Sequence, residues 1–145
     1  AAVEVTVVAV KTGIRQPSGR TYGRLLHAVL QSNGFAEAHG RKLGATEDEV
    51  AAAEATARVV LTHQVVAPGG REVFREAPVV VRMNDGTLVE GRIDLAFRDK
   101  DGWVVVDYKT GSADQQKAVR QLRLYAHALA TATGLPARAV LLEIA

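Results

Sequence analysis

Apolar and polar positions alternate with a strand-like period through the second half of the chain. Three consecutive segments of this kind, residues 72–83, 87–98 and 102–109, are rich in Val, Ile, Leu and aromatic residues. The turn sequences Asn84-Asp85-Gly86 and 99–102 separate them and are typical of hairpin connections. Because both connections are short, the pattern predicts an antiparallel meander of three strands.

Two helices are predicted before the meander, from apolar positions that recur every three or four residues. The first covers residues 21–31. The second begins at Thr46, which has the spacing of a capping box with Glu49, and continues to about residue 62. Residues 39–44 between the two helices are polar and are expected to form a loop.

The remaining predicted elements lie toward the two ends of the chain. Residues 3–11 alternate loosely and predict a strand or an extended lead-in segment. After a Pro-Gly break at residues 67–70 and the meander, a long helix is predicted over 113–133, with Gly134 just past its end and a final strand at 139–144. The predicted order is therefore two helices, a three-strand meander, a long helix and a final strand.

The chain has 145 residues, which predicts a single domain over 1–145, with residues 1–12 either a linker or an extra strand. It starts without Met and ends on a predicted strand, so we expect it to be excised from a larger protein. No apolar run approaches the roughly 20 residues that span a bilayer, so no membrane partner is expected. The chain has no cysteine, which fits a reducing cytosol and excludes cysteine-ligated zinc or iron–sulfur sites.

Charge adds little to this picture. The net charge is only +2, which is weak support for a nucleic-acid partner. Arginine outnumbers lysine 13 to 5, and arginine suits bidentate contacts with phosphate. A GC-rich genome, which favours Arg and Ala codons, explains this bias equally well.

The second and third strands carry two carboxylates that a simple register brings together. If residues 99–102 form the turn, Asp94 lies directly opposite Asp107, and opposed side chains have Cβ atoms about 4.5–5.5 Å apart. Lys109 follows two residues later and points to the same face. A turn at 101–102 alone would slide the register by two and keep the same faces. The other face then pairs Phe97 with Val104, Leu95 with Val106 and Ile93 with Tyr108, all apolar or aromatic.

Two carboxylates and a lysine at one place suit metal-dependent hydrolysis of a phosphodiester. Mg²⁺ or Mn²⁺ binds one or two carboxylates, keeps several waters and accepts phosphate oxygens. Lys109 can hold the attacking water or stabilise the charge that develops on the phosphate. A structural cluster of ion pairs at a sheet edge is the alternative. Acids placed between apolar residues are costly to bury, so we favour the functional interpretation.

The residues of this cluster match a known pattern. Gly91-Arg92-Ile93-Asp94 followed by Asp107-Tyr108-Lys109 resembles the Gly-x-x-Asp and Asp/Glu-x-Lys elements of the PD-(D/E)XK nuclease superfamily. The resemblance implies a restriction-endonuclease-like α/β core. In that core a mixed central sheet, made of the three-strand meander and a further strand after a crossover helix, is flanked by helices. It also implies that Asp94, Asp107 and Lys109 are catalytic.

Two further motifs resemble those of the RecB-like branch, which includes the C-terminal nuclease domains of AddA/UvrD-type helicase–nucleases. Gly23 and His27 match its Gly-x-x-x-His element, and Gln121 and Tyr125 match its Gln-x-x-x-Tyr element. The four elements occur in the family's order. The residues alone would suggest an ordinary helical histidine and a buried amide–hydroxyl pair, so these site roles rest on the resemblance.

The resemblance implies a set of ligands and contacts. The metal ligands would be His27, Asp94 and Asp107, with the backbone carbonyl of Tyr108 as a fourth. The residues that would line the site or contact DNA are Gln121, Tyr125 and the acidic Glu76 on the first strand of the meander. Arg120 and Arg123 are expected to face solvent and to touch phosphates; an ordinary polar helix face explains them as well.

The implied activity is that of a Mg²⁺- or Mn²⁺-dependent deoxyribonuclease without an iron–sulfur cluster. Its partners would be DNA, single-stranded or unwound, and a helicase domain or subunit in cis or in trans. Its place would be DNA repair or recombination in the bacterial cytoplasm. Two other functions stay open: a catalytically inactive module that binds or guides single-stranded DNA, and an unrelated α/β domain used in subunit docking. The complete acid–lysine set argues against the first.

Overall fold

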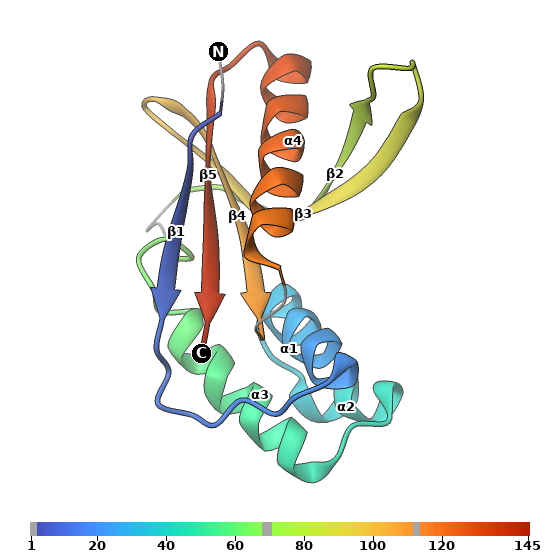
Figure 1. Ribbon diagram of the computed structural model, residues 1–145. Helices are drawn as coiled ribbons and strands as arrows, with labels where there is room; N and C mark the ends of the chain where they lie inside the picture. The colour runs from blue at the N-terminus through green and yellow to red at the C-terminus, as the bar shows by residue number, and fades with distance from the viewer. Residues whose placement is uncertain (1–2, 68–70, 112–113) are drawn as a thin grey trace.

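A mixed five-stranded sheet organises the chain, as the computed structural model shows for residues 3–67, 71–111 and 114–145 (Figure 1). The elements in chain order are β1 (Val5–Val10), α1 (Arg20–Ser32), α2 (Ala36–Leu43), α3 (Glu47–Val60), β2 (Val73–Arg82), β3 (Leu88–Asp99), β4 (Gly102–Thr110), α4 (Gln115–Thr133) and β5 (Ala137–Ile144). The strand order is β1-β5-β4-β3-β2, with β1, β5 and β4 parallel and the meander β2–β4 antiparallel. The predicted α/β class, the meander and the strand after a crossover helix are therefore confirmed.

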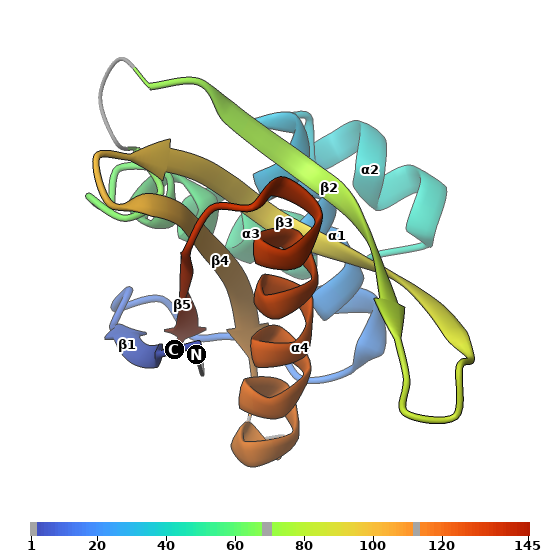
Figure 2. The same cartoon turned by 90° about the horizontal axis from the view of Figure 1, so that it is seen from above.

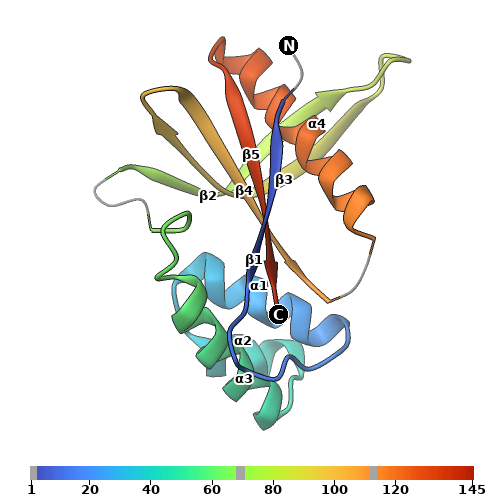
Figure 3. The same cartoon turned by 60° about the vertical axis from the view of Figure 1, so that its left-hand side comes forward.

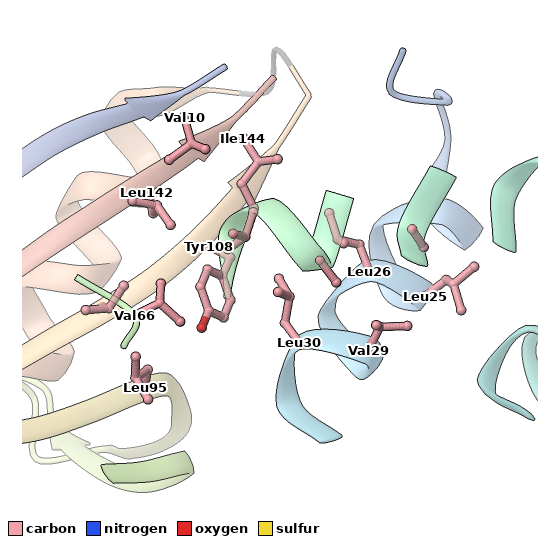
Figure 4. Close-up of a cluster of buried hydrophobic side chains, with 14 of the residues drawn as sticks. Val10, Leu25, Leu26, Val29, Leu30, Val66, Leu95, Tyr108, Leu142 and Ile144 are labelled. Atoms are coloured by element: carbon pink, nitrogen blue, oxygen red, sulfur yellow. The ribbon is translucent and has the colours of Figure 1, made fainter. Parts of the chain in front are cut away.

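Helices cover both faces of the sheet, so the protein has two apolar cores. On one face α1 and α3 bury Leu26, Leu30 and Val60 against Leu95 and Tyr108 (Figure 4). On the other face the apolar stripe of α4 packs against the sheet through residues such as Leu122 and Ala126. The views in Figures 2 and 3 show α4 alone on its face, with α1, α2 and α3 grouped on the opposite side.

 

The hairpin register predicted from the sequence is confirmed from the turn as far as the pairing of Leu95 with Val106. Leu95 pairs with Val106, Phe97 with Val104, and Asp99 with Gly102. Beyond Leu95 one expectation is wrong. Ile93 does not share a face with Tyr108 but lies in the core beneath α4. The alternation of β3 side chains between the two faces of the sheet thus changes phase at Asp94.

Helix α2 corrects the expectation of a loop over residues 39–44. Its eight residues include Gly40, a weak helix former, which hides the helical pattern in the sequence. The backbone of Gly40 packs so closely on α3 that a Cβ there would lie 2.4 Å from Val50 Cγ2. Contact with α3 therefore stabilises a helix that local propensity does not favour.

The helix ends follow the sequence closely. Thr46 caps α3, and Glu49 returns a hydrogen bond to the Thr46 backbone, so the capping box is confirmed. Gly134 has a left-handed conformation at the end of α4. The predicted start of that helix at residue 113 and most of the break at 67–70 lie outside the described residues. No helix in the described ranges is long and apolar enough to cross a membrane.

Candidate active site

The two predicted carboxylates lie where β3 and β4 separate. Ladder pairing of these strands stops at Leu95 and Val106, and β3 continues with β2 alone (Figure 2). Side chains then replace backbone partners across the gap. The Asp94 backbone N–H donates to Asp107 Oδ1 at 3.0 Å, and the Tyr108 N–H donates to Asp94 Oδ2 at 2.9 Å. Asp94 and Asp107 are thus brought together by side chain–backbone hydrogen bonds rather than by the direct cross-strand pairing that the register predicted.

Strand β2 is distorted at the same level of the sheet. Glu76 has φ of 51°, a left-handed conformation that is uncommon for a residue with a side chain. Pairing with β3 continues on either side, from Arg75 to Leu95 and from Ala77 to Ile93, but skips Glu76 and Asp94. Asp94 is therefore in register with neither neighbouring strand, which accounts for the change of phase in β3. Left-handed strain in mid-strand is typical of functional sites.

Helix α1 brings His27 and Gln31 to Asp94. His27 Nδ1 lies 3.4 Å from Asp94 Oδ1, and Gln31 Nε2 donates to the same oxygen at 3.2 Å. The His27 ring also packs edge-on against Tyr108, with ring centroids 6.1 Å apart. One apolar face of α1 is buried in the core, which fixes the direction in which His27 points. The structure thus joins His27 to the carboxylates; the sequence did not single out Gln31.

Burial and mutual repulsion perturb the ionisation of this cluster. Burial, and next the negative charge of Asp94, raises the pKa of Asp107 to about 7. Burial by itself lowers the pKa of His27, but the hydrogen bond to Asp94 and the charges of Asp94 and Asp107 outweigh it and raise that pKa. Two partly buried carboxylates share one imidazole as their counter-charge. A bound cation would reduce the repulsion between them.

The donor set fits a hard divalent cation. It offers carboxylate oxygens, an imidazole nitrogen and Gln31 Oε1, a buried oxygen that accepts no hydrogen bond from the residues that the structure describes. In the present side-chain arrangement, no group of three or more His, Asp and Glu residues within the described ranges forms a metal cage. Mg²⁺ needs only one or two carboxylates besides water and phosphate oxygens. Asp94 and Asp107 therefore suffice as the protein's share of such a site.

The predicted catalytic lysine has partners that the sequence did not reveal. Lys109 Nζ donates to the Gly111 carbonyl at 3.0 Å and lies 3.9 Å from Glu143 Oε2. Glu143 is the parallel partner of Lys109 on β5, and Gln115 Nε2 donates to its other oxygen at 3.0 Å. Only 9% of the Lys109 side chain is exposed, so its ammonium is held at the end of β4.

Tyr125 packs against β3 at Gly91, on the side of the sheet that α4 covers. A Cβ on Gly91 would lie 2.4 Å from Tyr125 Cζ and 2.6 Å from its Oη, so only glycine allows the ring to lie on β3. The glycine of the Gly-x-x-Asp motif and the tyrosine of the Gln-x-x-x-Tyr motif are therefore a packing pair. Gln121 and Arg120 are exposed, and within the described residues neither side chain makes a hydrogen bond.

The remaining predicted residues divide between two places. Arg123 Nε donates to the Val3 carbonyl, so Arg123 lies over the lead-in to β1, at the sheet edge opposite β2. Glu76 instead lines an open cleft of about 520 Å³ together with Asp94 and His27. The same cleft is lined by the residues Gly19, Arg20, Gly23, Arg24, Ala28, Gln31 and Thr110. The two arginines were not singled out from the sequence.

Comparison with known proteins gives the site a family. A family model described as the PD-(D/E)XK nuclease superfamily matches residues 7–145. No curated protein matches the chain significantly. Members of the superfamily are usually hydrolytic nucleases that use divalent metals such as Mg²⁺, and the mixed sheet flanked by helices agrees with their restriction-endonuclease-like fold. Because the match covers nearly all of the sequence, the chain belongs to the PD-(D/E)XK nuclease superfamily.

Proposed function

We propose that the chain is a Mg²⁺- or Mn²⁺-dependent deoxyribonuclease, the nuclease module of a DNA repair or recombination helicase. The observation that supports it most is the juxtaposition of Asp94, Asp107 and His27 where β3 and β4 separate. Perturbed pKa values cluster at functional sites, and burial together with the charge of Asp94 raises the pKa of Asp107 to about 7.

Each residue has a role that its position allows. Asp94 and Asp107 hold the cation, and His27 and the Tyr108 carbonyl complete the protein ligands. A bound Mg²⁺ or Mn²⁺ supplies a water of lowered pKa and neutralises charge on the phosphate. Lys109 orients the attacking water or stabilises the developing negative charge. Glu143 and the Gly111 carbonyl hold the Lys109 ammonium in place.

Cleavage assays with matched variants test the proposal. Wild type is expected to cut labelled single- or double-stranded DNA with Mn²⁺, whereas Asp107→Ala and Lys109→Ala lose most activity. Asp101→Ala is the control, because Asp101 is an exposed acid in the turn at the far end of the same hairpin. Equal cleavage by all four proteins would contradict the assignment of the site.

A catalytically inactive module that guides single-stranded DNA is the second candidate. It is favoured by one observation: Lys109 contacts Glu143 and Gly111 rather than the carboxylates of Asp94 and Asp107. Binding of single-stranded DNA without Mn²⁺ binding or cleavage would establish this alternative.

Association with a helicase, in cis or in trans, rests on the four motifs of the RecB-like branch. Their order along the chain, from Gly23 to Tyr125, supports this part of the proposal. Helicase motifs encoded upstream of Ala1, or a helicase that copurifies with the chain, would support it. Their absence from both places would count against it.

A further inference from the structure

Helix α1 presents a straight polar stripe beside the candidate active site. Arg20, Arg24, His27 and Gln31 recur every three or four residues, so they lie on one face of the helix. The opposite face, which includes Leu26 and Leu30, is buried in the core. All four residues of the stripe line the cleft of about 520 Å³ that contains Asp94. The stripe therefore continues the site outward along α1.

The outer half of the stripe is positively charged and lacks acidic partners. Arg20 and Arg24 are exposed, and neither forms an ion pair within residues 3–67, 71–111 and 114–145. The first turn of α1 contains no acidic residue, and Gly19 provides no side-chain cap. The partial positive charge of the helix N-terminus thus adds to that of the two arginines. Anions are favoured at this mouth of the cleft.

The segment before α1 is anchored, so this charged end has a fixed position. Tyr22 Oη donates to Gln16 Oε1 at 2.6 Å, and Gln16 Nε2 donates to Thr56 Oγ1 at 2.8 Å. Thr56 is fully buried on α3. These bonds tie the approach to Gly19 to two helices. A surface whose arginines are placed in this way is suited to positioning a ligand.

We infer that Arg20 and Arg24 form a subsite for the backbone phosphates of single-stranded DNA next to the phosphate that is cut. The inference rests on the proposed nuclease function. At 1.5 Å of rise per residue, Arg24 and Arg20 lie about 4.5 Å and 10 Å from His27 along the helix axis. A strand that runs along α1 would therefore bring successive backbone phosphates past Arg24 and then Arg20. The subsite offsets the repulsion between DNA and the acids Glu76, Asp94 and Asp107.

Salt-dependent binding tests this subsite independently of hydrolysis. A fluorescein-labelled single-stranded oligonucleotide is titrated by anisotropy in Mg²⁺ with the Asp107→Asn protein, in which cleavage is blocked. The same titration is then repeated with the Asp107→Asn protein that also carries Arg20→Gln and Arg24→Gln. Each phosphate contact on a single strand contributes about 0.7 to the slope of log K against log salt. Loss of the two arginines should reduce the magnitude of this slope by about 1.4. It should also weaken binding roughly 25-fold at 0.1 M salt.

Arg41→Gln/Arg58→Gln is the control for the loss of two positive charges; Arg58, unlike Arg20 and Arg24, is paired with Glu54 on α3. This control removes the same charge from exposed arginines that line a pocket between α2 and α3, and neither lines the Asp94 cleft. Binding that falls equally in both double variants, or in neither, overturns the subsite. With an otherwise wild-type site, the arginine variant should raise KM and leave kcat nearly unchanged. If wild type cleaves no DNA with Mn²⁺ or Mg²⁺, the proposed function fails instead, whatever the arginine variants do to binding.

Discussion

The contact between Gly91 and Tyr125 can be tested by adding a single methyl group. In Gly91→Ala the new Cβ would lie 2.4–2.6 Å from three atoms of the Tyr125 ring and hydroxyl. Carbon atoms in good contact are about 3.5–4.0 Å apart, so the ring must move by about 1 Å. The backbone of Gly91 does not have a positive φ, so alanine meets no conformational barrier there. Overpacking of this kind typically costs about 1–3 kcal/mol.

Urea unfolding measures this cost, and a double-mutant cycle assigns it to the pair. Gly91→Ala should lower the unfolding midpoint with an unchanged m-value. In a Tyr125→Ala background the same methyl group has room, so the two substitutions should couple by about 1–3 kcal/mol. Gly23→Ala is the control from the other glycine motif, because its Cβ would lie 3.6 Å from Thr110 Oγ1, an ordinary contact. Within a helix it should stabilise the fold by up to about 1 kcal/mol. If Gly91→Ala is as stable as wild type, or is equally destabilising without the Tyr125 ring, the packing argument is refuted.

Three further outcomes are expected. A hydrogen bond from Arg138 holds the pKa of Asp99 at about 2, below its unfolded value of about 3.9. The ionised carboxylate therefore stabilises the fold at neutral pH, and this contribution is lost as pH falls from about 4 to 2. The destabilisation caused by Asp99→Asn, measured by urea unfolding, should shrink over the same pH range. Thr46→Ala removes the capping box of α3 and should cost about 1 kcal/mol in the same assay, while Thr62→Ala, outside the helix, should cost less. Glu143→Gln should lower kcat several-fold without changing KM, because it loosens Lys109; an unchanged kcat would show that Glu143 does not position the lysine.

The hairpin that carries the site could be predicted from sequence because its constraints are local. Turn residues and alternating apolar positions fixed the pairing of Leu95 with Val106, and that pairing brings Asp94 toward Asp107. The phase change at Asp94 could not be predicted in the same way. It depends on the left-handed conformation of Glu76 on the neighbouring strand, and nothing in an Arg-Glu-Ala sequence indicates that conformation.

Residues that reach the site through tertiary contacts were harder to find. Glu143 meets Lys109 only because β5 returns parallel to β4 after the crossover helix, and periodicity within a strand does not specify that register. Arg20 and Arg24 had the same helical spacing as His27, so that signal was present in the sequence. It became informative once the structure showed that their face of α1 lines a cleft.

The central claim is that Asp94 and Asp107 together bind a divalent cation, and a Mn²⁺ titration followed by electron paramagnetic resonance tests it most directly. Wild type should bind Mn²⁺. Asp94→Asn and Asp107→Asn should each weaken binding by more than about tenfold, the lower end of the loss seen even for residues that only support metal ligands. Asp101→Asn should bind like wild type. Equal Mn²⁺ affinity in all four proteins, or no binding by wild type at millimolar Mn²⁺, would contradict the account.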